Sequence, residues 1–322
     1  MLTYIALKEK PKEFLAATSL HVVEFEQLLP KFREQLASLY SSDLTKKGRP
    51  RQRQMGAGPK EKLSTVEDKL LFILIYQKTY PLQTMHGLQF EMSQPRTNYW
   101  IHRLLPIVKK VLGDLKMVPE RDPKKVANDS LTNEVAPDLL IDGTERRRQR
   151  PKDAKKQEEY YSGKKKAHMD KNILLANAHT RKVVYLSPTE NGKKHDKKIA
   201  DENNIAYPSG ATLGKDTGFQ GYEPKGVITF QPKKKPKGKE LSAADKWMNK
   251  LISGTRVLVE NTIAGVKRCR IVKDIFRNTK EGFSDLAMEV ACALHNFRTD
   301  CRHPVAVVVA PLRQLSAQAY YG

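Results

Sequence analysis

The sequence has little cysteine and no long apolar run, and both absences exclude classes of protein. Its three cysteines, Cys269, Cys292 and Cys301, cannot form a disulfide framework, so we expect a reducing, cytoplasmic environment. The longest apolar run, from Leu70 to Tyr76, is far shorter than the roughly 20 residues of a membrane-spanning helix. The first residues lack a basic stretch followed by an apolar core, so we expect no secretory signal.

Acidic residues are scarce relative to basic ones, and this imbalance indicates a polyanionic partner. The 322-residue chain has 58 Lys and Arg against 36 Asp and Glu, a formal net charge of +22 at pH 7. Such an excess repels itself unless a polyanion binds it. Because no long basic amphipathic helix is present, we expect nucleic acid rather than a membrane. A hydrophobic fraction of 39% suffices for a folded core, and the length fits about two domains.

The first basic cluster lies in residues 45–62, a stretch rich in Gly and Pro that predicts a flexible linker. Residues 47–51 (Lys-Gly-Arg-Pro-Arg) resemble an AT-hook, in which Arg49 and Arg51 enter a narrow minor groove. A solvated linker that touches phosphates without sequence preference explains the same composition. The preceding residues, 1–44, are predicted to contain an amphipathic helix, continuous or broken at its internal proline.

Three helices are predicted within residues 63–116. The first begins at Ser64, with Glu67 as its capping-box partner, the second follows Pro81, and the third begins near Ser93. A helix, a short helix and a longer helix in succession are typical of a helix-turn-helix DNA-binding domain. An ordinary three-helix bundle with a polar outer face explains the same pattern, but the basic linker just upstream favours DNA.

The third predicted helix carries Arg96, Asn98 and Arg103 near its start. In a recognition helix, Arg and Asn side chains at these positions suit bidentate contacts with guanine and adenine edges. We therefore expect all three residues to bind DNA.

A polar connector, 117–136, separates this region from an α/β pattern over residues 137–302, which is followed by a tail, 303–322. Short apolar runs, of which 182–186 is rich in β-branched and aromatic residues, are followed there by helical segments, which predicts an α/β domain. The predicted strands are 138–143, 172–176, 182–186, 211–215 and 227–230, and helices are predicted at 195–204 and from 242 onward, with a break near 278–282.

Three acidic residues lie where carboxylates do chemistry. Asp142 and Asp216 each end a predicted buried strand, where α/β sheets hold reactive side chains in place. Glu260 lies in a predicted helix, with Arg256 and Lys267 on the same face. Taken singly, each acid is better explained by a helix cap or a surface charge. Together, three carboxylates in a basic chain suit Mg²⁺, and two such ions promote phosphoryl transfer.

Two basic runs, 146–166 and 231–239, lie between these acids, and we expect them to contact phosphates. The pair His195 and Asp196 either lies beside the metal ligands or forms a helix start or a simple turn. The sequence leaves both interpretations open.

Five short motifs occur in order along the chain: Ile141–Glu145 (Ile-Asp-Gly-Thr-Glu), Tyr161–Lys166 (Tyr-Ser-Gly-Lys-Lys-Lys), Gly192–Asp196 (Gly-Lys-Lys-His-Asp), Asp216–Tyr222 (Asp-Thr-Gly-Phe-Gln-Gly-Tyr) and Arg256-x3-Glu260-x6-Lys267. This series resembles the DDE transposases of bacterial insertion sequences, in particular the insertion sequence five group and its Harbinger-like relatives. The resemblance covers about residues 63 to 300 and includes the predicted helix-turn-helix. Ser253 stands where that group usually has Tyr.

The resemblance implies an RNase H-like core in which Asp142, Asp216 and Glu260 are the catalytic residues and hold two Mg²⁺ or Mn²⁺ ions. It implies a transposase that binds the terminal inverted repeats of its element, cleaves DNA by two-metal-ion hydrolysis and joins the 3′-hydroxyl to target DNA by transesterification. Phosphate contacts are expected from four basic residues: Lys164, Lys165, Arg256 and Lys267. Since two ends have to be joined, we expect at least a homodimer on double-stranded DNA, in the bacterial cytoplasm and at the nucleoid.

Two other functions explain part of the sequence. An inactive transposase kept as a DNA-binding regulator would have the same fold, but the three acids and their Arg and Lys neighbours are intact, which disfavours it. A basic RNA-binding protein is also disfavoured, because no run of exposed aromatic residues suits stacking on single-stranded bases.

Overall fold

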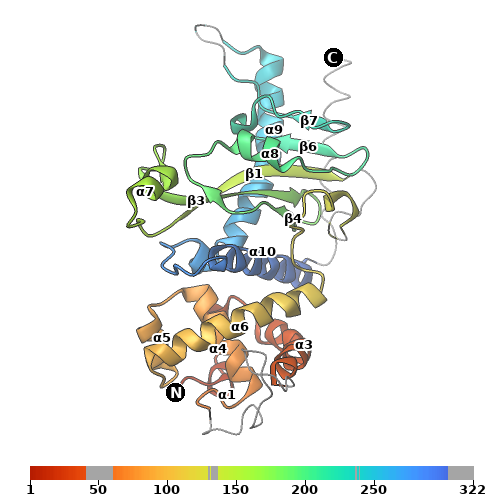
Figure 1. Cartoon of the computed structure of the whole chain (residues 1–322). Coiled ribbons are helices and arrows are strands. Elements are labelled where there is room, and N and C mark those ends of the chain that lie inside the picture. The colour runs from red at the N-terminus through yellow and green to blue at the C-terminus, as the bar shows by residue number, and fades with distance from the viewer. Residues whose placement is uncertain (41–60, 130, 132–136, 236–237, 239, 304–322) are drawn as a thin grey trace. The chain divides into compact units, whose positions relative to one another are not determined.

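The chain forms two compact units (Figure 1). Unit 1 is built mainly from residues 1–115 and unit 2 mainly from residues 116–303. Arg49 and Arg51, the AT-hook-like arginines of the predicted linker, lie outside the described residues. None of the described helices is long and apolar enough to cross a membrane. The computed structural model describes residues 1–40, 61–129, 131, 137–235, 238 and 240–303.

The described part of unit 1 is all-helical. Its third helix is continuous through Pro30, so the predicted amphipathic helix is not broken there. Two short helices that the apolar pattern did not predict precede it. The helices are α1 (Tyr4–Lys8), α2 (Pro11–Thr18), α3 (Val22–Tyr40), α4 (Val66–Thr79), α5 (Gln83–Gln89) and α6 (Gln94–Asp114).

The central helix of unit 1 is α4, which is buried on every side from Asp68 to Gln77. Its N-cap is Thr65, whose Oγ1 accepts a hydrogen bond from the Asp68 backbone at 3.0 Å, so the predicted cap at Ser64 is wrong by one residue. Two adjacent hydroxyl residues can each cap a helix, and tertiary contacts select between them. The Asp68 carboxylate accepts a bond from the Tyr4 backbone at 2.7 Å, which fixes this helix start.

Helices α5 and α6 form the helix-turn-helix. Gly87 in α5 permits the tight turn between them, because a Cβ there would lie 2.4 Å from the Met92 carbonyl oxygen. His86 is fully buried beside Phe72, with Nε2 3.1 Å from its carbonyl oxygen, and burial lowers the pKa of His86 to about 4. A neutral, buried histidine thus fixes α5 against α4. The apolar residues of α6 are buried in the core of unit 1, so the outer face of this helix is polar.

Unit 2 is built on one mixed sheet with the strand order β4-β3-β1-β6-β7. Strand β3 is antiparallel to both β4 and β1. Strand β6 is parallel to both β1 and β7. The short strands β2 and β5 also pair with β3. This is the RNase H-like core that the resemblance implies (Figure 1). The strands are β1 (Asp138–Arg147), β2 (Tyr161–Ser162), β3 (Ala167–Asn177), β4 (Val183–Leu186), β5 (Glu190–Asn191), β6 (Thr212–Lys215) and β7 (Ile228–Phe230).

Helices complete unit 2 around this sheet. The long helix α9 packs against β1 and β6 and buries Ile252, Val259 and Val266, and α10 packs against β4 and α9. Three-residue 3₁₀ turns occur at Val126–Asn128, Thr217–Phe219 and Arg270–Val272. The helices are α7 (Ala154–Tyr160), α8 (Asp196–Asn203), α9 (Ala243–Val266) and α10 (Phe283–Arg302).

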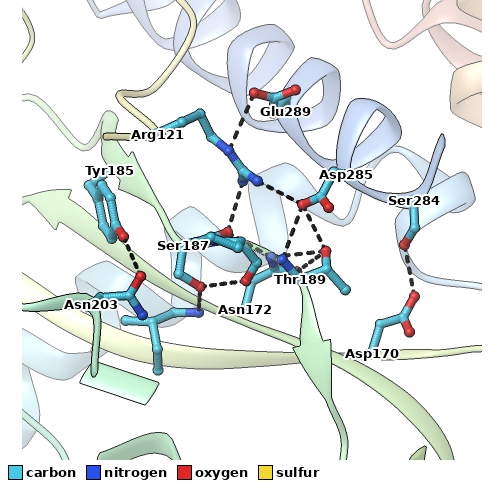
Figure 2. A network of polar contacts seen from close by, with 12 residues as sticks. Arg121, Asp170, Asn172, Tyr185, Ser187, Thr189, Asn203, Ser284, Asp285 and Glu289 are labelled. Atoms are coloured by element: carbon cyan, nitrogen blue, oxygen red, sulfur yellow. Dashed lines mark hydrogen bonds and ion pairs between the residues drawn. The ribbon is translucent and has the colours of Figure 1, made fainter. Parts of the chain in front are cut away.

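A buried polar network joins the segment after α6 to the sheet and to α10 (Figure 2). Arg121 donates to the Ser187 carbonyl at 2.8 Å and pairs with Asp285 at 2.7 Å and Glu289 at 3.4 Å. Arg146 of β1 lies in the same region and is only 2% exposed. We expected its basic run to contact phosphates, and for Arg146 that expectation is wrong, because the alternation of β1 turns this side chain inward.

Candidate active site

Strand register places Asp142 and Asp216 side by side. In the parallel pair of β1 and β6, Ile141 lies opposite Lys215, and each acid is the next residue along the chain. Neighbouring strands are about 4.8 Å apart and equivalent positions face the same side, so the two carboxylates leave the sheet together. Asp142 Oδ1 accepts a hydrogen bond from the Gly143 backbone at 2.7 Å. Asp216 Oδ1 accepts bonds from the backbone and hydroxyl of Thr217.

The electrostatics of Asp142 indicate a site for a cation. Its pKa is raised to about 6, chiefly by burial and further by the charges of Asp216 and Asp196, against the opposing Gly143 bond. A cation held between such carboxylates would favour their ionised forms. Their hard oxygen donors are those that Mg²⁺ and Mn²⁺ prefer.

Glu260 lies further from this pair, on the exposed side of α9. Arg256, one turn earlier, connects it to the strand acids, because its Nη2 lies 3.5 Å from Glu260 Oε1 and 3.4 Å from Asp216 Oδ2. The predicted shared face of Arg256 and Glu260 is therefore present. In the part of the chain that the structure describes, no three His, Cys, Asp or Glu side chains converge closely enough to hold a metal ion. Thus Asp142 and Asp216 are already together, while Glu260 is held by a guanidinium.

A cavity of about 720 Å³ opens over the two aspartates. Its walls carry the predicted Lys164, Lys165 and Lys267 as well as His195 and Asp196. Burial lowers the pKa of Lys267, and its Nζ donates to the Glu145 carbonyl at 3.3 Å. Glu260 and Arg256 are not among the lining residues. Among the described residues, the lining is Asp142, Gly143, Glu145, Arg147, Tyr161, Ser162, Gly163, Lys164, Lys165, Met169, Lys171, Gly192, Lys193, Lys194, His195, Asp196, Asp216, Gly218 and Lys267.

Lys171 is a site residue that the sequence did not single out. It is 7% exposed, and its Nζ lies 3.1 Å from Asp196 Oδ1 and 3.5 Å from Glu145 Oε1 while it donates to the Lys194 carbonyl at 2.8 Å. The register of β1 and β3 pairs Lys171 with Glu145. The apolar run begins only after Asn172, so the sequence around Lys171 offered no signal. Because Lys171 balances two acids beside Asp142, it holds the cavity wall in place.

Of the two interpretations that the sequence left open for His195 and Asp196, the helix start is present, while a place beside metal ligands stays a prediction. Asp196 is the first residue of α8 and His195 is its N-cap residue, and both line the cavity. The Asp196 carboxylate rests against Gly143, where an added Cβ would lie 2.8 Å from its Cγ. Gly143 is therefore required by close packing between strand β1 and α8.

We expect the Gly143→Ala variant to lose about 1–3 kcal/mol of unfolding free energy, because the new methyl overlaps the Asp196 carboxylate and strains its pair with Lys171. Gly163→Ala is the matched control, since Gly163 lines the same cavity and a Cβ there meets nothing within 4 Å. Urea unfolding followed by circular dichroism measures both. Equal stability of the two variants would show that the Gly143 contact relaxes at no cost.

The predicted DNA-binding residues Arg96, Asn98 and Arg103 lie on the outer side of α6. Tyr99 lies between Arg96 and Arg103, with its ring centroid 5.0 Å from Arg96 Cζ and 5.6 Å from Arg103 Cζ. Arg103 Nη1 also donates to the Tyr99 hydroxyl at 2.9 Å. Asn98 Nδ2 donates to Gln83 Oε1 at 3.2 Å. The first half of the helix therefore presents two cations and an amide on its polar face.

Comparisons with known proteins match both regions. A family model described as "DDE superfamily endonuclease" matches residues 141–296, and one described as "Helix-turn-helix of DDE superfamily endonuclease" matches residues 61–114. A protein named "Probable transposase for insertion sequence element IS702", from Microchaete diplosiphon, is 25% identical over 263 residues, which cover 80% of this chain and 88% of that protein. No solved structure matches this chain.

Proposed function

We infer the function of this chain from its membership of the DDE superfamily, whose helix-turn-helix and endonuclease domains it carries and whose transposases it resembles. We propose that it binds the terminal inverted repeats of an insertion sequence, cleaves the DNA beside them and joins the freed 3′-hydroxyl to target DNA by transesterification. The observation that carries this proposal is the register of β1 and β6, which puts Asp142 and Asp216 together in a cavity walled by lysines.

The carboxylates of Asp142 and Asp216 are suited to hold a divalent cation, and Glu260 would complete the set. When bound, Mg²⁺ or Mn²⁺ ions supply Lewis-acid stabilisation of the attacking and leaving oxygens, with two ions expected per site. The Arg256 guanidinium pairs with the carboxylates of Asp216 and Glu260 in this structure. It suits a DNA phosphate equally well. Transfer of Arg256 to the DNA backbone would release Glu260 toward the strand acids.

Lysines around the cavity would hold the DNA strand. Lys164, Lys165 and Lys193 line its wall, and Lys267 lines the same cavity as Asp142. These cations attract phosphates without reading sequence, so cleavage is expected to weaken as salt rises. The helix-turn-helix would then select the DNA sequence. Because two ends have to meet, we propose that the active species on DNA is at least a homodimer.

A DNA-binding regulator without catalytic activity is the second candidate. No observation favours it, because Asp142 and Asp216 are adjacent and Arg256 and Lys267 accompany them.

Removal of divalent cations tests the proposal. On duplexes that contain the DNA flanking the gene, we expect cleavage with Mg²⁺ or Mn²⁺ and none with excess EDTA, because the carboxylates alone supply no Lewis acid. Products are resolved on denaturing gels, and joining to a labelled target duplex is followed in the same reaction. Cleavage that persists in EDTA would contradict the mechanism. DNA binding without cleavage under any metal condition would favour the regulator.

A further inference from the structure

The ends of the helix-turn-helix helices carry a cluster of three amide side chains. Gln83 is the first residue of α5 and Gln94 is the first residue of α6. Gln94 Nε2 donates to Gln83 Oε1 at 2.7 Å, and Asn98 Nδ2 donates to the same oxygen at 3.2 Å. Gln94 is exposed, and Gln83 and Asn98 are half-buried. Because these side chains contribute little to the hydrophobic core of unit 1, core packing does not explain the cluster.

These bonds couple the orientations of the Gln94 and Asn98 amides to that of Gln83. Each donates one N–H to Gln83 Oε1, and reversing either amide alone would place oxygen against oxygen. A primary amide has two N–H groups and a carbonyl oxygen, so one donor and one acceptor of each side chain remain outside the cluster. Since the orientation is set before any ligand arrives, less conformational entropy is lost on binding.

A donor beside an acceptor matches one base in particular. In the major groove adenine presents N7 as acceptor and N6 as donor, and Gln or Asn contacts both at once. Guanine presents two acceptors there and would leave the amide carbonyl facing an oxygen. The N-terminal residues of the second helix of a helix-turn-helix are those that meet base edges, and Gln94 and Asn98 occupy the first two turns of α6.

The neighbouring arginines would contribute to the affinity for DNA rather than to the choice of base. Arg96 and Arg103 hold their charges on either side of Tyr99, which is 38% exposed. Cations kept on one face by an aromatic ring suit phosphates at the edges of a groove. The first half of α6 therefore combines oriented amides with phosphate-binding arginines.

We propose that Gln94, oriented by Gln83, reads an adenine in the major groove of the bound DNA, and that Asn98 reads an adjacent A·T pair. This inference rests on the proposed function only in that α4, α5 and α6 bind DNA. It adds Gln83 and Gln94 to the residues that select the sequence.

Selection from a library of randomised DNA duplexes with the full chain tests this, because every possible binding sequence competes in one experiment. We expect the wild type to enrich a motif with two neighbouring A·T pairs, and Gln94→Ala to lose the preference at one of them. Asn98→Ala should relax the other pair, and Gln83→Ala should weaken both. Gln89→Ala is the matched control, since Gln89 is an exposed glutamine at the opposite end of α5.

Titration of the enriched duplex then measures the contact. Replacing the selected adenine with 7-deazaadenine removes N7 and should weaken wild-type binding about tenfold, with no effect on Gln94→Ala. Arg103→Ala should instead weaken binding to all duplexes and lower its salt dependence. An unchanged motif and affinity for Gln94→Ala would overturn this inference and leave the proposed function standing. A wild-type chain that enriches no motif would overturn both.

Discussion

Strand cleavage by the Asp142→Asn variant is expected to fall by roughly a thousandfold while its binding to DNA stays unchanged. Asparagine has the size of aspartate, and its Oδ1 can still accept the Gly143 backbone bond at 2.7 Å. It removes the charge that a divalent cation requires. It also removes the like-charge repulsion that helps to raise the pKa of Asp142 to about 6, so the fold is not expected to suffer.

Asp216→Asn and Glu260→Gln should show losses of similar size, and a double Asp142→Asn, Asp216→Asn variant should be little worse than either single one, since the acids act as a unit. Asp201→Asn is the control, because Asp201 lies on α8 outside the cavity and pairs with Lys197. Gel-based cleavage rates and filter binding separate chemistry from affinity. Full cleavage by any one of the three acid variants would end the proposed mechanism.

The Glu260→Gln variant is the most informative of the three. Glu260 is exposed and held by Arg256, whereas the two aspartates already share a cavity. Loss of cleavage in Glu260→Gln would mean that this carboxylate joins the others on DNA, after Arg256 has moved to a phosphate.

The Arg146→Ala variant is expected to lower the unfolding free energy of unit 2 by about 3–5 kcal/mol. The guanidinium donates to the carbonyl and hydroxyl oxygens of Ser284, to Asn172 Oδ1 at 2.7 Å and to Thr189 Oγ1 at 2.8 Å. Its removal would deprive these acceptors of a charged donor and leave Asp170 with one fewer cation nearby. Figure 2 labels Asn172, Thr189 and Ser284, which accept these bonds, and Asp170, which accepts a bond from the Ser284 hydroxyl.

Arg147→Ala is the matched control, because Arg147 is the next residue of β1, is exposed and lines the cavity on the other face of the strand. Its effect on stability should stay within about 0.5 kcal/mol. Urea unfolding gives the free energies, and hydrogen exchange of the β1 and β3 amides shows that unit 2 is the part affected. Equal losses for the two variants would mean that the buried network contributes no net stability.

The sequence by itself determined the order of elements and the two aspartates of the site. Capping, proline and apolar signals predicted α4, α5 and α6, and strand-like apolar runs placed Asp142 and Asp216 on two strands. The predicted strand end at Asp142 is wrong, because β1 continues to Arg147, whereas Asp216 does follow the last residue of β6. These signals are local, because a helix or strand repeats its buried positions at a fixed spacing. The catalytic roles of these acids stay predictions until the variants are measured.

Local pattern failed wherever a contact between distant residues decides the outcome. The N-cap of α4 is Thr65 rather than the predicted Ser64, and the bond from the Tyr4 backbone to Asp68 fixes this helix start. Arg146 lies in a basic run but is buried, since the pleat of β1 turns alternate side chains to opposite faces and only the assembled sheet shows which face is covered.

The tertiary structure alone decided which charges meet. Lys171 joins Glu145 and Asp196, and Arg256 joins Asp216, although each of these partners lies far away along the chain. Charged residues follow no fixed spacing along the sequence. Composition therefore predicts a basic surface but not which charged side chains form ion pairs. Pairing follows from strand register and helix packing, which bring distant residues within the few ångströms over which ions interact strongly.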